Sequence, residues 1–294
     1  MSTPVPRPAV LVVGIAPRSG TNYLHDLITL HPRAAGCPPV MEDYLLHYAA
    51  PLQVYARQVA SRWRTFENTW RLPLPRDAES GLLAALGDGL LGYLGTLCQG
   101  EVLVTKTPSA ENLDLAPLLF PHARLVLLVR DGRAVVESSV RSRLGPQHGN
   151  RYDVFTEQWT AGARAILHFC AAFPGRYHLV RYEDLVEDLA GTLPALLAFC
   201  DLDAAAYDFA AARALPVRGS STFGQAPPPP PEPRARAGAH LDWQPKPRTA
   251  DFEPLRRWAD WPAARHAAFN AVAGECMTRL GYALQEATAE DAGR

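Results

Sequence analysis

The feature that most constrains the fold is a set of short, continuous Val- and Leu-rich runs without polar alternation. They lie at residues 9–16, 101–106, 124–130 and 177–182. Continuous apolar runs of this length are typical of parallel strands that are covered on both faces of a sheet. Helical patterns, with apolar residues three and four apart, follow three of the four runs. We therefore predict right-handed βαβ units and a three-layer α/β fold, in which helices flank a central parallel sheet.

The size and charge of the chain narrow its class and its partners. The sequence has 294 residues, of which 48% are hydrophobic and 20% are charged. This is enough to bury a substantial core, and we expect a single domain over residues 1–294. The formal net charge is −1, so nothing marks the whole molecule as a binder of nucleic acid or of acidic membranes. Any anion site must therefore be local.

The sequence shows no pattern typical of a membrane span, a signal peptide, a disulfide framework or a metal site. No run approaches the roughly 20 apolar residues that cross a bilayer. The stretch M1-S-T-P-V-P-R-P-A-V10 is too proline-rich for a signal peptide, which predicts a cytoplasmic protein without a membrane partner. The five cysteines are widely spaced and form no C-x-x-C pair, and the histidines lack metal-ligand spacing. We expect reduced thiols and no metal.

Two segments depart from the strand and helix alternation. Residues 44–100 are rich in Trp, Arg, Leu and Ala and contain no strand pattern, which predicts a helical insert that builds a substrate pocket. An apolar cluster within this insert forms either a wall of that pocket or ordinary core: Trp63, Phe66, Trp70 and Leu72. Residues 223–247 are proline-rich and include five consecutive prolines at 227–231. Such a sequence excludes packed helix or strand and predicts an extended or mobile loop.

The stretch A16-P-R-S-G-T-N-Y-L24, directly after the first run, has the position of a phosphate-binding loop. The N–H groups and the dipole at the start of the following helix favour an anion. Gly20 lets the backbone approach closely, and Arg18 can add a charge-assisted hydrogen bond. The alternative is that Ser19 or Thr21 only caps the helix. The loop lacks the Lys of a nucleoside-triphosphate P-loop, which disfavours ATP as its ligand.

Polar side chains also stand at the ends of two other predicted strands. Lys106 ends the second run, Arg130 ends the third, and Ser138 follows eight residues later in the next helix. Ligands of open α/β sheets bind beyond the carboxyl ends of the strands, and the last spacing lets a guanidinium and a hydroxyl meet on a second anion. The alternatives are that Lys106 is solvated and that Arg130 pairs with Asp131 in a surface turn.

Together these motifs resemble the family of sulfotransferases that use 3′-phosphoadenosine 5′-phosphosulfate (PAPS). P17-R-S-G-T21, continued by Asn22 and Tyr23, is similar to the loop of this family that binds the 5′-phosphosulfate. Arg130 and Ser138 resemble its 3′-phosphate pair. The resemblance implies a P-loop NTPase-like sulfotransferase fold with two separated anion sites, one for each phosphate end of the nucleotide.

A third motif, R181-Y-E-D-L-V186, is a phrase typical of the same enzymes. Its Tyr182 is similar to a tyrosine that lies near the nucleotide in this family, and the alternative for it is a core aromatic at a strand end. S220-S-T222 also resembles a nucleotide-contacting loop, which implies a binding role for Ser221. The proline-rich stretch replaces the shorter basic loop of the family, so that Trp243 and Lys246 have no assigned role.

The sequence is most similar to the tyrosylprotein branch of the family, in which a Glu shortly after a His-Pro pair is the general base. H31-P32 is followed by Glu42, which the resemblance makes the base, with Asp43 as its rival. Lys106 would assist the leaving group. Hydroxyl-directed cytosolic relatives carry a catalytic His two residues after this Lys, whereas this sequence has Pro108.

The resemblance predicts transfer of a sulfuryl group from PAPS to a hydroxyl acceptor, with 3′,5′-adenosine bisphosphate (PAP) as the product and with Glu42, Lys106 and Arg18 in catalytic roles. A small hydroxylated metabolite, phenolic or glycosidic, is the favoured acceptor, and a homodimer stays open. Three alternatives stay open too: a nucleoside-triphosphate kinase, a non-catalytic nucleotide-binding protein, and a peptide-binding module built on the proline-rich segment.

Overall fold

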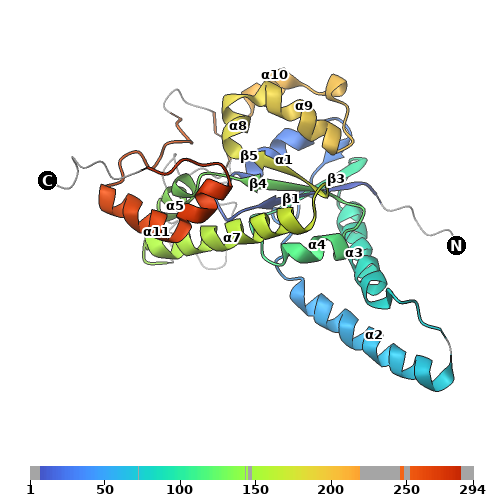
Figure 1. Ribbon diagram of the computed structural model, residues 1–294. Helices are drawn as coiled ribbons and strands as arrows, with labels where there is room; N and C mark the ends of the chain where they lie inside the picture. Colours follow the sequence, from blue (N-terminus) through green and yellow to red (C-terminus); the bar gives the residue numbers. More distant parts are fainter. Residues whose placement is uncertain are drawn as a thin grey trace, which may run out of the picture.

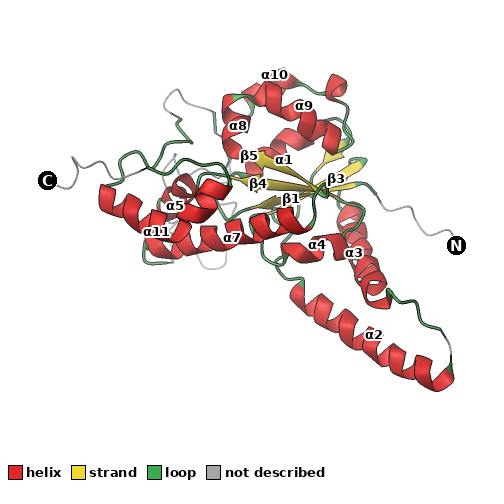
Figure 2. Cartoon of the chain, in the orientation of Figure 1, coloured by secondary structure: helices red, strands yellow, loops and turns green. Residues whose placement is uncertain are grey.

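The computed structural model describes residues 7–71, 73–142, 144, 148–218, 246–247 and 252–285. Its centre is a five-stranded parallel sheet with the strand order β2-β3-β1-β4-β5. The strands are β1 (Ala9–Gly14), β2 (Ala34–Ala35), β3 (Val102–Thr107), β4 (Arg124–Val129) and β5 (Tyr177–Arg181). Figures 1 and 2 show helices above and below this sheet. The predicted three-layer α/β fold is confirmed.

Each of the four apolar runs forms a strand at its predicted place. β1, β3 and β4 are almost wholly buried, which explains why their sequences show no alternation of polar and apolar residues. The short strand β2 was not predicted. Its two alanines pair in parallel with Val102 and Leu103 at the edge of the sheet, and two residues are too few to leave a pattern in the sequence.

Two groups of helices cover the two faces of the sheet (Figure 1). On one face, apolar side chains of β1 and β4 pack in one cluster with those of helices α3, α4, α5, α7 and α11. On the other face, Val10, Val12 and their neighbours pack with helices α1, α8, α9 and α10. The helices of the first face are α3 (Ala78–Thr96), α4 (Ala116–Leu119), α5 (Gly132–Val140), α7 (Tyr152–Ala172) and α11 (Ala263–Arg279). Those of the second are α1 (Thr21–Thr29), α8 (Tyr182–Glu187), α9 (Leu189–Phe199) and α10 (Phe209–Ala214).

The stretch from 44 to 100, expected to be helical, holds α3 and the long helix α2 (Ala50–Trp70). In Figure 1, α2 runs away from the layered body of the molecule, with α3 beside it. The expectation that its aromatic cluster is ordinary core is wrong, because Trp63, Phe66 and Trp70 are 43%, 46% and 69% exposed. A helix that extends past the sheet has few neighbours to cover them. Leu72 lies outside the described residues.

The proline-rich segment lies outside the described residues except at its end. Lys246 forms an antiparallel bridge with Val217, in which each backbone N–H donates to the carbonyl of the other residue. This bridge brings the chain after the segment back beside the chain before it. In the part of the chain that the structure describes, every helix is too short or too polar to cross a lipid bilayer.

Candidate active site

The loop between β1 and α1 has the tight geometry that the sequence predicts for it. Arg18 has a φ of 72° and Gly20 a φ of 102°, both in the left-handed region. A Cβ at Gly20 would stand 2.4 Å from the Tyr182 ring, so that only glycine fits between the loop and this ring. Gly14 is equally confined, since its Cβ would stand 2.5 Å from Ser19 Oγ. The loop is therefore folded back closely on the end of β1.

The alternative that Ser19 or Thr21 only caps helix α1 is wrong. Gly20 occupies the N-cap position, and no side chain accepts a hydrogen bond from the first turn. Ser19 is fully buried, and its Oγ makes no hydrogen bond with any described residue. A helix start without a side-chain cap, lined by a buried hydroxyl, is suited to an anionic ligand.

Arg130 links this loop to the neighbouring strand β4. Its side chain is buried, Nη1 donates to Arg18 O at 2.9 Å, and Nη2 donates to Pro254 O at 2.5 Å. Its guanidinium carbon lies 4.1 Å from the centre of the Tyr182 ring, a cation–π geometry. The alternative of an exposed Arg130–Asp131 pair is wrong, because Asp131 pairs with Arg133 at 2.6 Å instead.

Ser138 lies on α5 directly across from Arg18, whose Nε donates to Ser138 Oγ at 3.3 Å. Tyr23, in the first turn of α1, contacts the Tyr182 ring edge-on, with 6.1 Å between the ring centres. The structure thus brings the predicted loop, Arg130, Ser138 and Tyr182 together at the carboxyl edge of the sheet. Ser221 and Trp243 lie outside the described residues.

A further arginine, Arg257, belongs to this cluster and was missed in the sequence. Burial and the neighbouring charge of Arg130 lower the pKa of Arg257 to about 10, while Tyr182 opposes the shift. The two guanidinium groups repel each other, and an anion bound between them would relieve this repulsion. The sequence held no signal for Arg257, because it follows the proline-rich segment rather than a strand.

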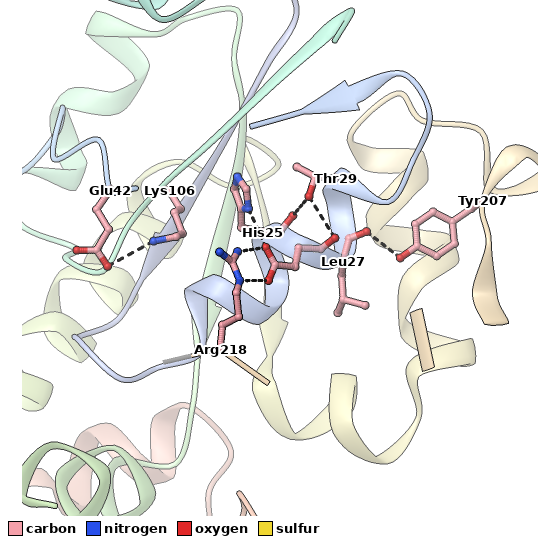
Figure 3. Close-up of polar contacts among 8 residues, drawn as sticks. His25, Leu27, Thr29, Glu42, Lys106, Tyr207 and Arg218 are labelled. Carbon is pink, nitrogen blue, oxygen red and sulfur yellow. Dashed lines mark hydrogen bonds and ion pairs between the residues drawn. The ribbon is translucent and has the colours of Figure 1, made fainter. Parts of the chain in front are cut away.

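A second centre lies at the end of β3, where Lys106 faces Glu42 (Figure 3). Lys106 Nζ lies 3.4 Å from Glu42 Oε1, and the side chains are 3% and 21% exposed. Burial lowers the pKa of Lys106, and the charge of Glu42 opposes this shift. The alternative of a solvated Lys106 is wrong. Tyr44 Oη donates to the other oxygen of Glu42 at 2.8 Å, so that the carboxylate is held from two sides.

Asp43, the rival of Glu42, has a different environment. Its Oδ1 accepts from Leu45 N at 2.8 Å, and its Oδ2 accepts from Thr105 Oγ1 at 2.6 Å. Burial raises the pKa of Asp43, and the hydrogen bond from Thr105 opposes this shift. Both oxygens are thus engaged in fixing the loop to β3, whereas Glu42 lies in a less buried position beside Lys106.

Asp26 and Arg218 form an ion pair near Lys106 that the sequence did not reveal (Figure 3). Arg218 Nε donates to Asp26 Oδ2 at 2.8 Å, and the charge of Arg218 adds to the lowering of the Lys106 pKa. Arg218 is the last described residue before the proline-rich segment. The pair therefore fixes Arg218 to α1 beside the candidate site.

Comparison with known proteins identifies the family. The model of the sulfotransferase family matches residues 8–206, which include β1 to β5 and the whole loop. The chain belongs to the sulfotransferase family. A candidate protein-tyrosine sulfotransferase of Caenorhabditis briggsae is 24% identical over 201 residues, which are 66% of this chain and 65% of that protein. A Caenorhabditis elegans protein of the same description is 31% identical over 86 residues, 29% of this chain and 33% of that protein. The chain thus spans less than two thirds of the curated relatives it matches.

A solved structure has the same fold. The sulfotransferase domain from the curacin biosynthetic pathway superposes over 96% of this chain and 100% of its own, with 20% identity and a TM-score of 0.55. The predicted sulfotransferase fold is confirmed by this likeness.

In this sulfotransferase, the phrase R181-Y-E-D-L-V186 is a scaffold for the Arg130 loop. Glu183 Oε1 accepts from Asp131 N at 2.9 Å, and its Oε2 accepts from Tyr282 Oη at 3.0 Å. Burial raises the pKa of Glu183, and the hydrogen bond from Asp131 N opposes the shift. The carboxylate therefore fixes the residue after Arg130, while its neighbour Tyr182 packs on Arg130 itself.

Aromatic and polar side chains of the sulfotransferase gather around Tyr44, the residue that contacts Glu42. His47 contacts the rings of Tyr44 and Tyr48, with 5.5 Å and 4.5 Å between ring centres. Its Nδ1 lies 2.9 Å from Ser109 Oγ and 3.1 Å from Glu111 Oε2. The sequence did not reveal this group, since nothing in the pattern of the insert indicates which residues lie near Glu42. Among the described residues, no cluster of His, Cys, Asp or Glu could hold a metal ion.

Proposed function

We propose that this protein transfers the sulfuryl group of PAPS to a hydroxyl acceptor. The observation that carries the proposal is the contact between Lys106 and Glu42 at 3.4 Å, at the same sheet edge as the uncapped loop. A buried ammonium beside a carboxylate supplies an acid and a base at one point. Arg18, Arg130 and Arg257 supply the positive charge that a doubly phosphorylated nucleotide requires.

The donor would lie with its phosphosulfate on the loop and its 3′-phosphate between Arg130 and Ser138. Glu42 would take the proton of the acceptor hydroxyl, whose oxygen forms the new bond to sulfur. The bond between sulfur and the bridging oxygen of PAPS breaks, and the electron pair leaves with PAP. Lys106 and Arg18 would stabilise the charge on the bridging and sulfuryl oxygens. As in phosphoryl transfer, positioning and charge stabilisation supply most of the acceleration.

Glu42 is the proposed base rather than Asp43. Both oxygens of Asp43 accept short hydrogen bonds, at 2.8 Å from Leu45 N and at 2.6 Å from Thr105 Oγ1, which hold its loop against β3. The Glu42 oxygen that faces Lys106 has a longer contact of 3.4 Å, so that it can turn to an acceptor hydroxyl at a lower cost. Glu42 contacts two groups that are themselves suited to catalysis, Lys106 and Tyr44. The phenol of Tyr44 would position the carboxylate, because its hydrogen bond fixes one oxygen while the other faces Lys106.

A small phenol is the proposed acceptor. The rings of Tyr44, His47 and Tyr48 next to Glu42 offer apolar faces and edges for an aromatic ring. The description of the nematode relatives, which names protein tyrosine, also points to an aryl hydroxyl. Tyr48 is 70% exposed, so that a ring can reach this group from solvent.

Ligand binding separates the proposal from its rivals without knowledge of the acceptor. We expect PAP to raise the melting temperature in the absence of magnesium, and ATP with magnesium to have little effect. Stabilisation by ATP with magnesium alone would favour a kinase. Turnover is then measured with labelled PAPS on a panel of phenols, glycosides and tyrosine peptides.

Two neighbouring carboxylate-to-amide changes test the base. Glu42→Gln keeps the shape of the side chain and one acceptor oxygen for Lys106, while its NH2 group can donate to Tyr44 Oη. It removes the base, and kcat should fall about 10²- to 10⁴-fold with unchanged PAP affinity. Asp43→Asn is the matched control. Its turnover should fall far less than that of Glu42→Gln, and its melting temperature should fall more. If Asp43→Asn abolishes turnover while Glu42→Gln does not, Asp43 is the base.

A further inference from the structure

Helix α2 carries an uncharged stripe of apolar side chains along one side. We call it the α2 stripe, and its members are Leu52, Tyr55, Val59, Trp63, Phe66 and Trp70. Successive residues of an α-helix are about 100° apart, so that these six positions fall within an arc of about 80°. Spacings of three and four residues that continue over five turns are the pattern of a helix that packs on another element.

Only the start of the α2 stripe packs within the chain, where Leu52 contacts the core. The buried residues of the helix are Ala56 and Ala60, which lie on the adjacent side, and α3 is the main element in contact with it. By contrast, Tyr55 is 54%, Trp63 43%, Phe66 46% and Trp70 69% exposed. A large aromatic side chain presents about 150–250 Å², so that these four leave roughly 400 Å² of apolar surface open.

This apolar area is about half of the surface that one subunit of a standard-sized dimer contributes. A stable interface buries about 800 Å² per partner, and about two thirds of a homodimer interface is apolar. The four aromatics alone supply most of that apolar part. Trp, Tyr and Phe are also the residue types that are enriched in interface cores.

The charges beside the stripe favour a second copy over a charged partner. Arg57 pairs with Glu79 of α3 at 3.6 Å, and Arg64 Nη2 donates at 2.7 Å to Arg76 O in the connection between α2 and α3. Arg62 lies flat on Phe66, 4.9 Å from its ring centre, which is a rim position. Arg57 and Arg64 are thus engaged by the chain itself, and the six positions of the stripe carry no charge that would select an acidic protein or an anionic membrane.

We propose that the α2 stripe is the dimer interface of this protein, with α2 of one copy packed antiparallel on α2 of the other. A two-fold axis makes such a contact self-complementary, because each subunit presents the same aromatic row to its partner. The far end of α2 extends from the body in Figure 1, where a second copy can approach without meeting the sheet or its covering helices. The proposal does not depend on the reaction proposed above.

Sedimentation and light scattering of the full chain test the interface. We expect the wild type to have twice the 32.1 kDa monomer mass at micromolar concentration. Phe66→Glu and Trp70→Glu, separately and together, should give monomers that keep their helix content and the PAP-induced thermal shift. Val272→Glu on α11 is the matched control, because Val272 is 44% exposed and lies on another element; it should stay dimeric.

A measurement on the wild-type protein tests the interface even if the variants fail to fold. Hydroxyl-radical footprinting of the wild type, at concentrations below and above dimer formation, should show protection of Trp63, Phe66 and Trp70 and no change at Val272. A wild type that is monomeric up to about 100 μM overturns the proposal, and so does a dimer that persists in the double variant or leaves these residues unprotected. A monomer that floats with phosphatidylcholine and phosphatidylglycerol vesicles would assign the stripe to a membrane instead.

Discussion

Arg130 offers the sharpest test of where the 3′-phosphate of the donor binds. Its Nη atoms donate to Arg18 O and Pro254 O, and its Nε is buried without a partner among the described residues. Replacement by Lys keeps the charge but loses the planar fork of donors. A hydrogen bond to a charged group contributes about 1.5–3 kcal/mol, and we therefore expect a loss of about 10- to 150-fold in the affinity that the 3′-phosphate supplies.

The assay compares two ligands on each protein by calorimetry: PAP, and adenosine 5′-monophosphate, which lacks the 3′-phosphate. The dissociation constant of adenosine 5′-monophosphate divided by that of PAP reports the affinity that the 3′-phosphate alone supplies. Arg130→Lys should reduce this ratio. General damage to the loop weakens both ligands equally and leaves the ratio unchanged. Arg124→Lys is the control, since Arg124 lies at the other end of the same strand. An unchanged ratio in Arg130→Lys would refute the assignment.

Two further predictions concern the scaffold of the site. Gly20→Ala should lower the free energy of unfolding by about 1–3 kcal/mol and weaken PAP binding, because its φ is 102° and its Cβ would meet the Tyr182 ring; Gly81→Ala, in open space on α3, should instead stabilise by about 0.5–1 kcal/mol. Equal melting temperatures for the two variants would contradict this. The raised pKa of Glu183 means that the folded state holds its proton to higher pH than the unfolded state does. The stability that this proton contributes is complete below pH about 4.5 and is lost as the pH rises through the folded pKa. In thermal melts at a series of pH values, Glu183→Gln should therefore gain stability relative to wild type as the pH rises. Melting temperatures of the two proteins that change in parallel with pH would refute the assignment.

The strands could be predicted because burial on both faces imposes a composition that is visible in one sequence. β1, β3 and β4 are continuous apolar runs for this reason. The carboxyl ends of parallel strands then meet at one edge, which is why Arg18, Lys106 and Arg130 could be expected to lie close together. Strand β2 escaped prediction, since two alanines at an edge carry no pattern.

The site residues that were not predicted lie in segments whose position the strand order does not determine. Arg257 and Arg218 follow or precede the proline-rich segment, and His47 belongs to the insert. Their positions depend on how loops pack against the finished sheet, which no local periodicity encodes. The exposure of Trp63 and Trp70 was missed for a related reason: an apolar helical stripe predicts that a helix packs, but not whether its partner is in the same chain.

Unsatisfied polar atoms at the carboxyl edge of the sheet support the proposal that this edge binds the donor. Ser19 Oγ, Asn22 Oδ1, Thr107 Oγ1 and Arg130 Nε are buried without a hydrogen-bond partner among the described residues. Each such group lowers the folding stability by about 1–3 kcal/mol. The nearby Lys106 loses hydration on burial, which lowers its pKa. Apolar side chains at these positions would fold more stably. Three of these groups can donate to the oxygens of an anion, and a phosphosulfate with a second phosphate presents enough oxygens to satisfy them together. Donor binding at this edge would then offset the cost in folding stability.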